Sequence, residues 1–295
     1  MFRDREDHGM FINILALRAY ATGARIYSDA EMSNHIHVNV ATDAPDRFGA
    51  YLRMSYTKYF NRKYGRTGRF GDGGMYILRV SGDGHQRVVN NYIMRNGLHH
   101  CATERALDYE WCSIHEPFAP QLGKIDLEQE ADYITDRHVI ADHLPRHSSY
   151  PDHYRMGADG VFLRRSFMDI EALEQLYETP AGFLYQMNRP TDESWIAEQK
   201  EDEGESCLIR LGNIEPGYAP EAVAAMLRNE SGSYFHPDRL QDLDVCRLID
   251  RRILKPLSLP SVYQLDFEQQ ASIYRKLHYE FNLPANQVRR CLALR

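Results

Sequence analysis

Residues 35 to 40 alternate polar and apolar side chains, and this alternation is typical of a β-strand with one buried face. Successive side chains of a strand point to opposite faces, so Ile36, Val38 and Val40 would anchor the strand in a core. His35 and His37 would then lie side by side on the other face. Two neutral imidazoles arranged in this way form half of a site for a divalent metal ion, whereas two histidines on a solvated strand face usually bind nothing.

The segments around this strand have the patterns of helices and of further strands. We expect a helix over residues 4–21, strands at about 24–28 and 75–80, a helix from Pro45 to about Tyr64, and a helix from Asp83 to Asn96. Gly65 would end the longer helix, and Gly97 would end the next one in a left-handed conformation. This order predicts an α+β fold over residues 1–120, with helices on one face of a mostly antiparallel sheet.

Beyond residue 120 the periodic patterns weaken. Residues 121–255 contain scattered prolines and an acidic stretch at 191–205, and we expect a mostly helical region of unknown role. Residues 256–295 contain two predicted helices, 265–281 and 286–294, joined by a tight turn. This is the shape of a helix-turn-helix, in which Gln287, Arg289 and Arg290 on the second helix would contact DNA. Many helix pairs of this kind only pack against each other.

The composition is that of a soluble protein with room for two domains, since 43% of its 295 residues are hydrophobic. No apolar run is long enough to span a membrane, and the start lacks the apolar stretch of a secretion signal, so we expect a cytoplasmic protein without a membrane partner. The five cysteines are scattered and include no CxxC pair, which argues against a disulfide framework and a zinc knuckle. The net charge of −7 belongs to the later part of the chain, because residues 1–116 carry 15 Lys and Arg against 13 Asp and Glu.

Residues 53–69 combine cations with aromatic rings and contain no acidic residue. The cations are Arg53, Lys58, Arg62, Lys63, Arg66 and Arg69, and the rings between them are Tyr56, Tyr59, Phe60 and Tyr64. A protein that binds single-stranded DNA needs cations for the phosphates and rings for the unpaired bases. The alternative is an amphipathic helix whose rings pack in a core and whose charges are only solvated.

The next predicted helix offers the remaining groups of a site, because Tyr92 and Asn96 are four residues apart and share one helix face. Asn96 would supply a carbonyl oxygen, which suits Mg²⁺ or Mn²⁺ beside two imidazoles. A Tyr92 phenolate that attacks phosphorus would form an ester that keeps the energy of the broken phosphodiester for rejoining. Alternatively, Tyr92 packs in a core and Asn96 only ends a helix. We expect His85, His99 and His100 to be surface histidines.

Four segments, in order, resemble motifs of the HUH single-tyrosine transposases, and most closely those of the REP-associated tyrosine transposases. They are EMSNHIHV (31–38), YTKYFNRKYGRTG (56–68), NYIMRNGL (91–98) and DYEWCS (108–113). The resemblance covers about residues 1–116. Four motifs in the same order are far more specific than a single His-x-His.

The resemblance implies a ferredoxin-like α+β fold, known as the HUH endonuclease fold, for residues 1–120. It further implies that His35 and His37 hold a divalent metal, Mg²⁺ or Mn²⁺, with Asn96 where the family has a polar third ligand. Tyr92 would be the nucleophile and would form a 5′-phosphotyrosine intermediate. The substrate would be single-stranded DNA next to a hairpin, and the protein would act as a monomer or a homodimer.

Two other hypotheses remain open at this stage. The chain shows no strand before its first helix, and its loop at 70–74 differs from the usual one in the family, so a domesticated DNA-binding protein without strand transfer is the alternative. A nucleotide hydrolase of the histidine-triad type also uses alternating histidines on a strand. That class needs a third histidine where this chain has Asn39.

Overall fold

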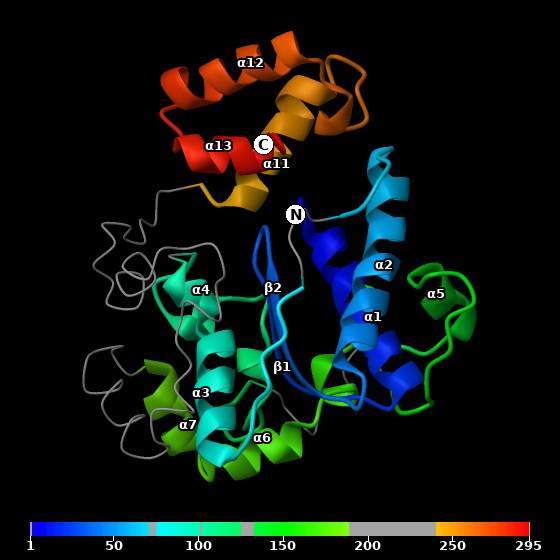
Figure 1. Cartoon of the computed structure of the whole chain (residues 1–295), viewed down its shortest axis with the longest axis vertical. Helices are drawn as coiled ribbons and strands as arrows, with labels where there is room; N and C mark the ends of the chain where they lie inside the picture. The colour runs from blue at the N-terminus through cyan, green and yellow to red at the C-terminus, as the bar shows by residue number, and fades with distance from the viewer. Residues whose placement is uncertain (1, 71–74, 101, 125–132, 189–239, 295) are drawn as a thin grey trace.

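A small antiparallel sheet lies between helices in the computed structural model of this chain (Figure 1). The structure describes residues 2–70, 75–100, 102–124, 133–188 and 240–294. The predicted acidic stretch at 191–205 and residues 71–74 of the predicted loop lie outside these residues. None of the described helices is both long and apolar enough to cross a membrane. The mixed α+β class predicted for the chain is confirmed.

Two long helices, α1 (Arg5–Thr22) and α2 (Pro45–Tyr64), pack against each other. Asp4 caps the start of α1 with its side chain. Gly23 ends α1 with φ of 65°, and Gly65 ends α2 with φ of 58°. Glycine adopts this left-handed conformation without strain, and both helices therefore end where the sequence predicts.

The buried face of α2 is largely aromatic. Its buried residues follow at intervals of four and are Phe48, Leu52, Tyr56, Phe60 and Tyr64. They join α1 and the strands in the first hydrophobic core. Three of the four rings predicted to stack on unpaired bases therefore lie in this core, and Tyr59 is half-buried. The amphipathic-helix alternative describes these rings better.

Strand β1 (Arg25–Glu31) pairs antiparallel with β2 (Ile36–Ala41). The register is irregular at Tyr27, between Ile26 and Ser28. A bulge of this kind reverses which side chains point to which face. Ile26 accordingly belongs to the first core, beside α1 and α2, whereas Ala30 belongs to the second core, beside α3.

Helices cover both faces of this sheet. Ile36, Val38 and Val40 pack against the first core, with α1 and α2, and helix α3 (Asp83–Met94) packs on the opposite face of both strands. The prediction that helices cover one face only is therefore wrong. The alternation in β2 gives each face its own kind of side chain, apolar toward α1 and α2 and polar toward α3.

Later segments of the chain cover the second edge of β1. A backbone bridge joins Ala30 to Cys112 in the antiparallel sense, and another joins Ile26 to Met168 in the parallel sense. The backbone N–H of Asp169 donates to the carbonyl of Ile26 at 2.9 Å. Single residues from two later segments, Cys112 and Met168, thus extend the pairing of β1 beyond its partner β2.

Residues 75–80 form no regular structure, so the strand predicted there is wrong. The side chain of Met75 packs against Gly49 of α2, and the segment pairs with none of the described strands. Its apolar residues, Met75, Tyr76 and Ile77, are 40–47% exposed. A strand-like pattern forms a strand only where its backbone groups pair with a neighbouring strand, and this segment lacks such a partner among the described strands.

The helix predicted over 83–96 is interrupted. Helix α3 ends at Met94, and a short helix α4 (Asn96–His99) follows after Arg95. Gly97 lies inside α4, where the ring of Tyr109 leaves no room for a Cβ atom. The prediction that Gly97 ends a helix in a left-handed conformation is wrong. Glycine is required here because the ring of Tyr109 approaches the backbone closely.

The described residues beyond 120 belong to the same packed body. Phe162 lies in the first core, and Leu173 and Phe183 lie in the second core. The boundary predicted at residue 120 is therefore not a boundary between cores. The elements here are β3 (Tyr133–Ile134), α5 (Arg137–Asp142), β4 (Met156–Gly157), α6 (Ile170–Tyr177) and α7 (Pro180–Asn188), with a 3₁₀ turn at Arg164–Ser166. Two further 3₁₀ turns, at Ala106–Asp108 and Ser113–His115, come before residue 120.

Residues 240–294 form a helical unit with a core of its own. Its elements are α11 (Asp242–Ile249), a π-helical turn (Asp250–Leu254), a 3₁₀ turn (Val262–Gln264), α12 (Phe267–Arg275), a second π-helical turn (Lys276–Glu280) and α13 (Ala285–Cys291). The predicted helix, turn and helix are thus present. Arg3 joins this unit to the rest of the chain, donating to Asp250 at 2.8 Å and to the carbonyl of Cys291 at 2.7 Å.

Candidate functional site

The two histidines of the His-x-His motif lie together at the start of β2. The ring centroids of His35 and His37 are 5.0 Å apart. Nδ1 of His35 contacts the side-chain oxygen of Asn34 at 2.8 Å, and this oxygen can only accept. The His35 proton therefore lies on Nδ1, which leaves the lone pair on Nε2, the form that binds metals. The Nε2 atoms of His35 and His37 are both buried.

Hydrogen bonds between side chains hold α3 at a fixed position on the strands. Asn39, on the same face of β2 as His37, donates to Asn90 at 2.9 Å and to Gln86 at 2.7 Å. Ser28 of β1 donates to the same oxygen of Asn90 at 2.6 Å. These buried contacts fix the register of α3 against β2. They thereby also fix the position of Tyr92, which follows Asn90 by two residues on α3.

Tyr92 of α3 lies between two histidines. Its ring meets the ring of His37 edge to face at 5.3 Å, and it lies nearly parallel to the ring of His99 at 5.5 Å. Tyr92 is 6% exposed. The structure therefore brings the predicted nucleophile and the predicted histidine ligands together, within a site that is largely enclosed by protein.

The histidines after Tyr92 belong to this cluster, which sequence reasoning missed. His99 and His85 are buried, and the ring of His100 is 4.8 Å from the ring of His35. The prediction that these three are surface histidines is wrong. The rings of His99 and His100 pack against those of Tyr92 and His35. His85 precedes Tyr92 at the start of α3, where it is buried and its Nδ1 accepts from the backbone N–H of Ser81 at 3.3 Å. The signal available in the sequence was the spacing of seven residues from Tyr92 to His99, which would place both on one face of an uninterrupted helix.

Asn96 is fully buried at the first residue of α4. Within the described residues neither its amide oxygen nor its amide nitrogen has a hydrogen-bond partner. A buried amide without partners is costly, and a bound cation or substrate would remove that cost. An amide oxygen and two imidazole nitrogens are suitable donors for a divalent ion, so the chemistry of these three side chains fits the predicted Mg²⁺ or Mn²⁺.

No group of three or more His, Cys, Asp or Glu side chains in the described part of the chain is arranged to hold a metal ion. The predicted ligands do not form such a group, because Asn96 is one of the three. His100 beside His35 does not complete a set of three histidines in this arrangement.

The cations predicted to contact DNA along α2 differ in their surroundings. Lys58, Arg62 and Arg69 are exposed, and Arg53 is half-buried. Arg66 is half-buried too; it donates to the side chain of Asn61 and to the carbonyl of Arg69, and its guanidinium lies over the ring of Tyr263. The three exposed residues are the ones placed to meet a ligand.

Lys63 belongs instead to a cluster of carboxylates at the start of α1. Its Nζ lies 2.7 Å from Asp4, 3.0 Å from Glu6 and 2.9 Å from Asp7. Burial lowers the pKa of Lys63, but the carboxylates of Asp7 and Asp4 outweigh burial and its pKa is raised. The side chain thus ties α2 to α1, which corrects the prediction that it meets phosphates.

The second helix of the C-terminal unit presents less to solvent than predicted. Gln287 is 3% exposed, and its amide donates to the carbonyl of Leu240 at 2.7 Å. Arg290 pairs with Asp242 at 2.9 Å. Of the three predicted DNA contacts only Arg289 is exposed, and Gln287 is a core residue of this unit rather than a surface residue.

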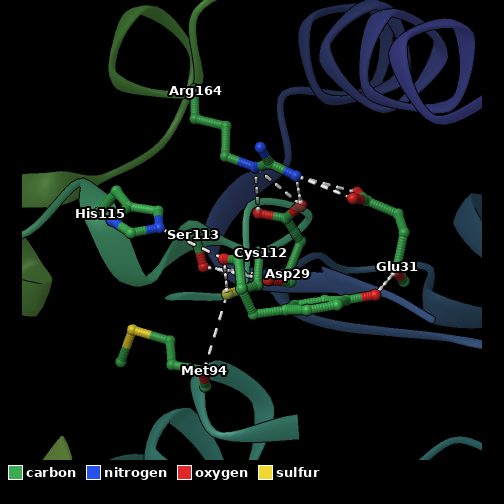
Figure 2. A network of polar contacts seen from close by, with 8 residues as sticks. Asp29, Glu31, Met94, Cys112, Ser113, His115 and Arg164 are labelled. Atoms are coloured by element: carbon green, nitrogen blue, oxygen red, sulfur yellow. Dashed lines mark hydrogen bonds and ion pairs between the residues drawn. The ribbon is translucent and has the colours of Figure 1, made fainter. Parts of the chain in front are cut away.

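On the opposite side of β1, a buried ion cluster joins distant parts of the chain (Figure 2). Arg164 donates to Asp29 at 2.8 Å and to Glu31 at 2.9 Å, and both carboxylates are fully buried. Burial raises the pKa of Glu31, and it raises the pKa of the neighbouring Cys112 to about 12. The thiol is therefore protonated and inert at neutral pH. The sequence offers no pattern that would identify Arg164 as the partner.

Comparisons with models of protein families, with curated proteins and with solved structures give no match to this chain. The likeness to the HUH single-tyrosine transposases therefore depends on the four sequence motifs alone.

Proposed function

We propose that this chain is a metal-dependent DNA strand transferase, which nicks and rejoins single-stranded DNA beside hairpins through Tyr92. The observation that carries the proposal is the contact between Tyr92 and His37, whose ring lies beside that of His35. A phenol next to a pair of imidazoles on a rigid strand is what phosphoryl transfer to tyrosine requires.

His35, His37 and Asn96 would hold the divalent ion, which would supply Lewis-acid polarisation of the scissile phosphate when bound. The oxygen of Tyr92 attacks phosphorus and loses its proton. A bond forms between this oxygen and phosphorus, and the bond from phosphorus to the 3′-oxygen breaks. The products are a 5′-phosphotyrosine and a free 3′-OH, and attack by a 3′-OH on the ester reverses the step and rejoins a strand.

The enclosure of Tyr92 favours a second candidate function. At 6% exposure the phenol meets a DNA phosphate only after neighbouring groups move aside. A DNA-binding protein of the same fold that lacks strand transfer would not need that movement. The two candidates differ in whether a covalent bond to DNA forms.

Labelled hairpin oligonucleotides with Mn²⁺ test the proposal. We expect an adduct that survives denaturing electrophoresis in the wild type and is absent in Tyr92→Phe. Tyr177→Phe is the matched control, because Tyr177 is equally buried and its hydroxyl bonds to Asn91 of α3 at 2.7 Å. Hairpin binding that EDTA leaves unchanged, without any adduct, would contradict the transferase and support the binding protein.

A further inference from the structure

Phe267 is the most exposed large hydrophobic residue in the described part of the chain, at 83%. It is the first residue of α12, which lies at the end of the molecule away from the sheet (Figure 1). Its position is well defined, because Asp266 and Gln269 cap the helix with reciprocal hydrogen bonds. A single exposed apolar side chain is ordinary, so its surroundings decide what it does.

Phe267 lines two open grooves. The first has a volume of about 650 Å³ and is also lined by Leu257, Ala271 and Arg275. The second has a volume of about 470 Å³ and is also lined by Tyr274, Arg289 and Leu294. Each groove is therefore lined by the ring of Phe267, by further apolar side chains and by one arginine.

The charge of this unit favours an anionic ligand. Residues 240–294 carry eight Lys and Arg against six Asp and Glu, in a chain whose net charge is −7. Three of the acidic residues pair with arginines. Six exposed cations pair with no carboxylate among the described residues, and they are Arg251, Arg252, Lys255, Arg275, Lys276 and Arg289. Glu268 lines the first groove, so an anion there would lie toward Arg275.

We propose that Phe267 is a stacking platform for the unpaired bases of single-stranded DNA. One base would occupy each groove, and Arg275 and Arg289 would reach the flanking phosphates. An exposed ring between two cations is the arrangement that single-strand binding uses, since every base has a face to stack. The choice of DNA rests on the proposed function. A duplex read by α13 is disfavoured, because Gln287 is buried there.

Fluorescence anisotropy of the full chain with a labelled oligothymidine at low salt tests this inference. We expect Phe267→Ala to weaken binding roughly 5- to 100-fold and Phe267→Trp to retain it. Tyr279→Ala is the control, because Tyr279 is 73% exposed and lines neither groove. Arg275→Gln should make the slope of log affinity against log salt concentration less steep by about one, which is the contribution of one phosphate contact.

Two outcomes would overturn the inference. One is equal affinity of Phe267→Ala and wild type for the oligothymidine. The other is a dimer in sedimentation that Phe267→Ala converts to monomer with DNA affinity unchanged, which would make the surface a contact between copies. The adduct assay with Tyr92 is run in parallel. Loss of oligothymidine binding in Phe267→Ala supports the role of Phe267 even if no adduct forms at Tyr92. Failure of this inference can therefore be distinguished from failure of the proposed function.

Discussion

The ring of Tyr92 meets the ring of His37 edge to face, with centroids 5.3 Å apart and planes at 87°. One residue comes from α3 and the other from β2, and Asn39 and Asn90 hold these two elements in register. A phenol and a pair of imidazoles thereby lie together in a largely buried cluster. The function of this protein depends on what that cluster binds.

Removal of either strand histidine should weaken metal binding. We expect His35→Ala and His37→Ala each to weaken Mn²⁺ binding by at least roughly tenfold in titration calorimetry. Mn²⁺ should bind the wild type more tightly than Mg²⁺, because imidazole ligands suit it better. His138→Ala, at an exposed position of α5, is the control. Unchanged Mn²⁺ affinity in both strand variants would rule out these residues as ligands.

Loss of Arg164 should destabilise the fold strongly. Arg164→Met leaves the buried carboxylates of Asp29 and Glu31 without their cation, and breaking such a pair costs about 3–5 kcal/mol. Urea unfolding measures the change. Arg137→Met removes an exposed pair with Asp152 and should cost less than about 1 kcal/mol. Equal effects of the two substitutions would mean that the buried cluster contributes no more than a surface pair.

His8 should make the protein sensitive to acid. Its ring is stacked between Phe2 and Trp111, and burial, with the charges of Arg164 and Arg5, lowers its pKa from 6.5 to about 3. Between pH 6.5 and about 3, the folded state therefore keeps His8 neutral, whereas His8 of the unfolded state binds a proton. This contribution to stability is complete well above pH 6.5 and is lost as pH falls toward 3, by on the order of 5 kcal/mol in total.

Urea unfolding of the wild type and of His8→Phe over this pH range isolates that contribution. The free energies of unfolding should differ by an amount that changes with pH below 6.5 and is constant above it. A difference that does not change with pH would show that His8 titrates alike in both states.

Local patterns were sufficient for the first elements of the fold. The ends of α1 and α2 are set by Gly23 and Gly65, whose conformational freedom can be read from the sequence. The alternation from His35 to Val40 correctly predicted which side chains share a face of β2. It did so because one face packs on the apolar first core and the other meets α3.

Other features depend on contacts between distant residues. Gly97 has the pattern of a helix end, but the packing of Tyr109 decides its role. Arg164 is an ordinary cation in sequence and becomes the partner of two β1 carboxylates only through the folded path of the chain. Lys63 follows the pattern of a DNA-binding segment, yet the carboxylates of α1 capture it. Each of these roles is decided by tertiary contacts, which join residues far apart in the sequence.

Mass spectrometry of the protein–DNA adduct tests the central claim most directly. After reaction with a labelled hairpin and Mn²⁺, the adduct is digested with protease and nuclease, and the modified residue is identified. The account predicts a nucleotide joined through its 5′-phosphate to Tyr92, with a free 3′-OH on the released strand. A link to any other residue, or hairpin binding without a covalent link under these conditions, would contradict it.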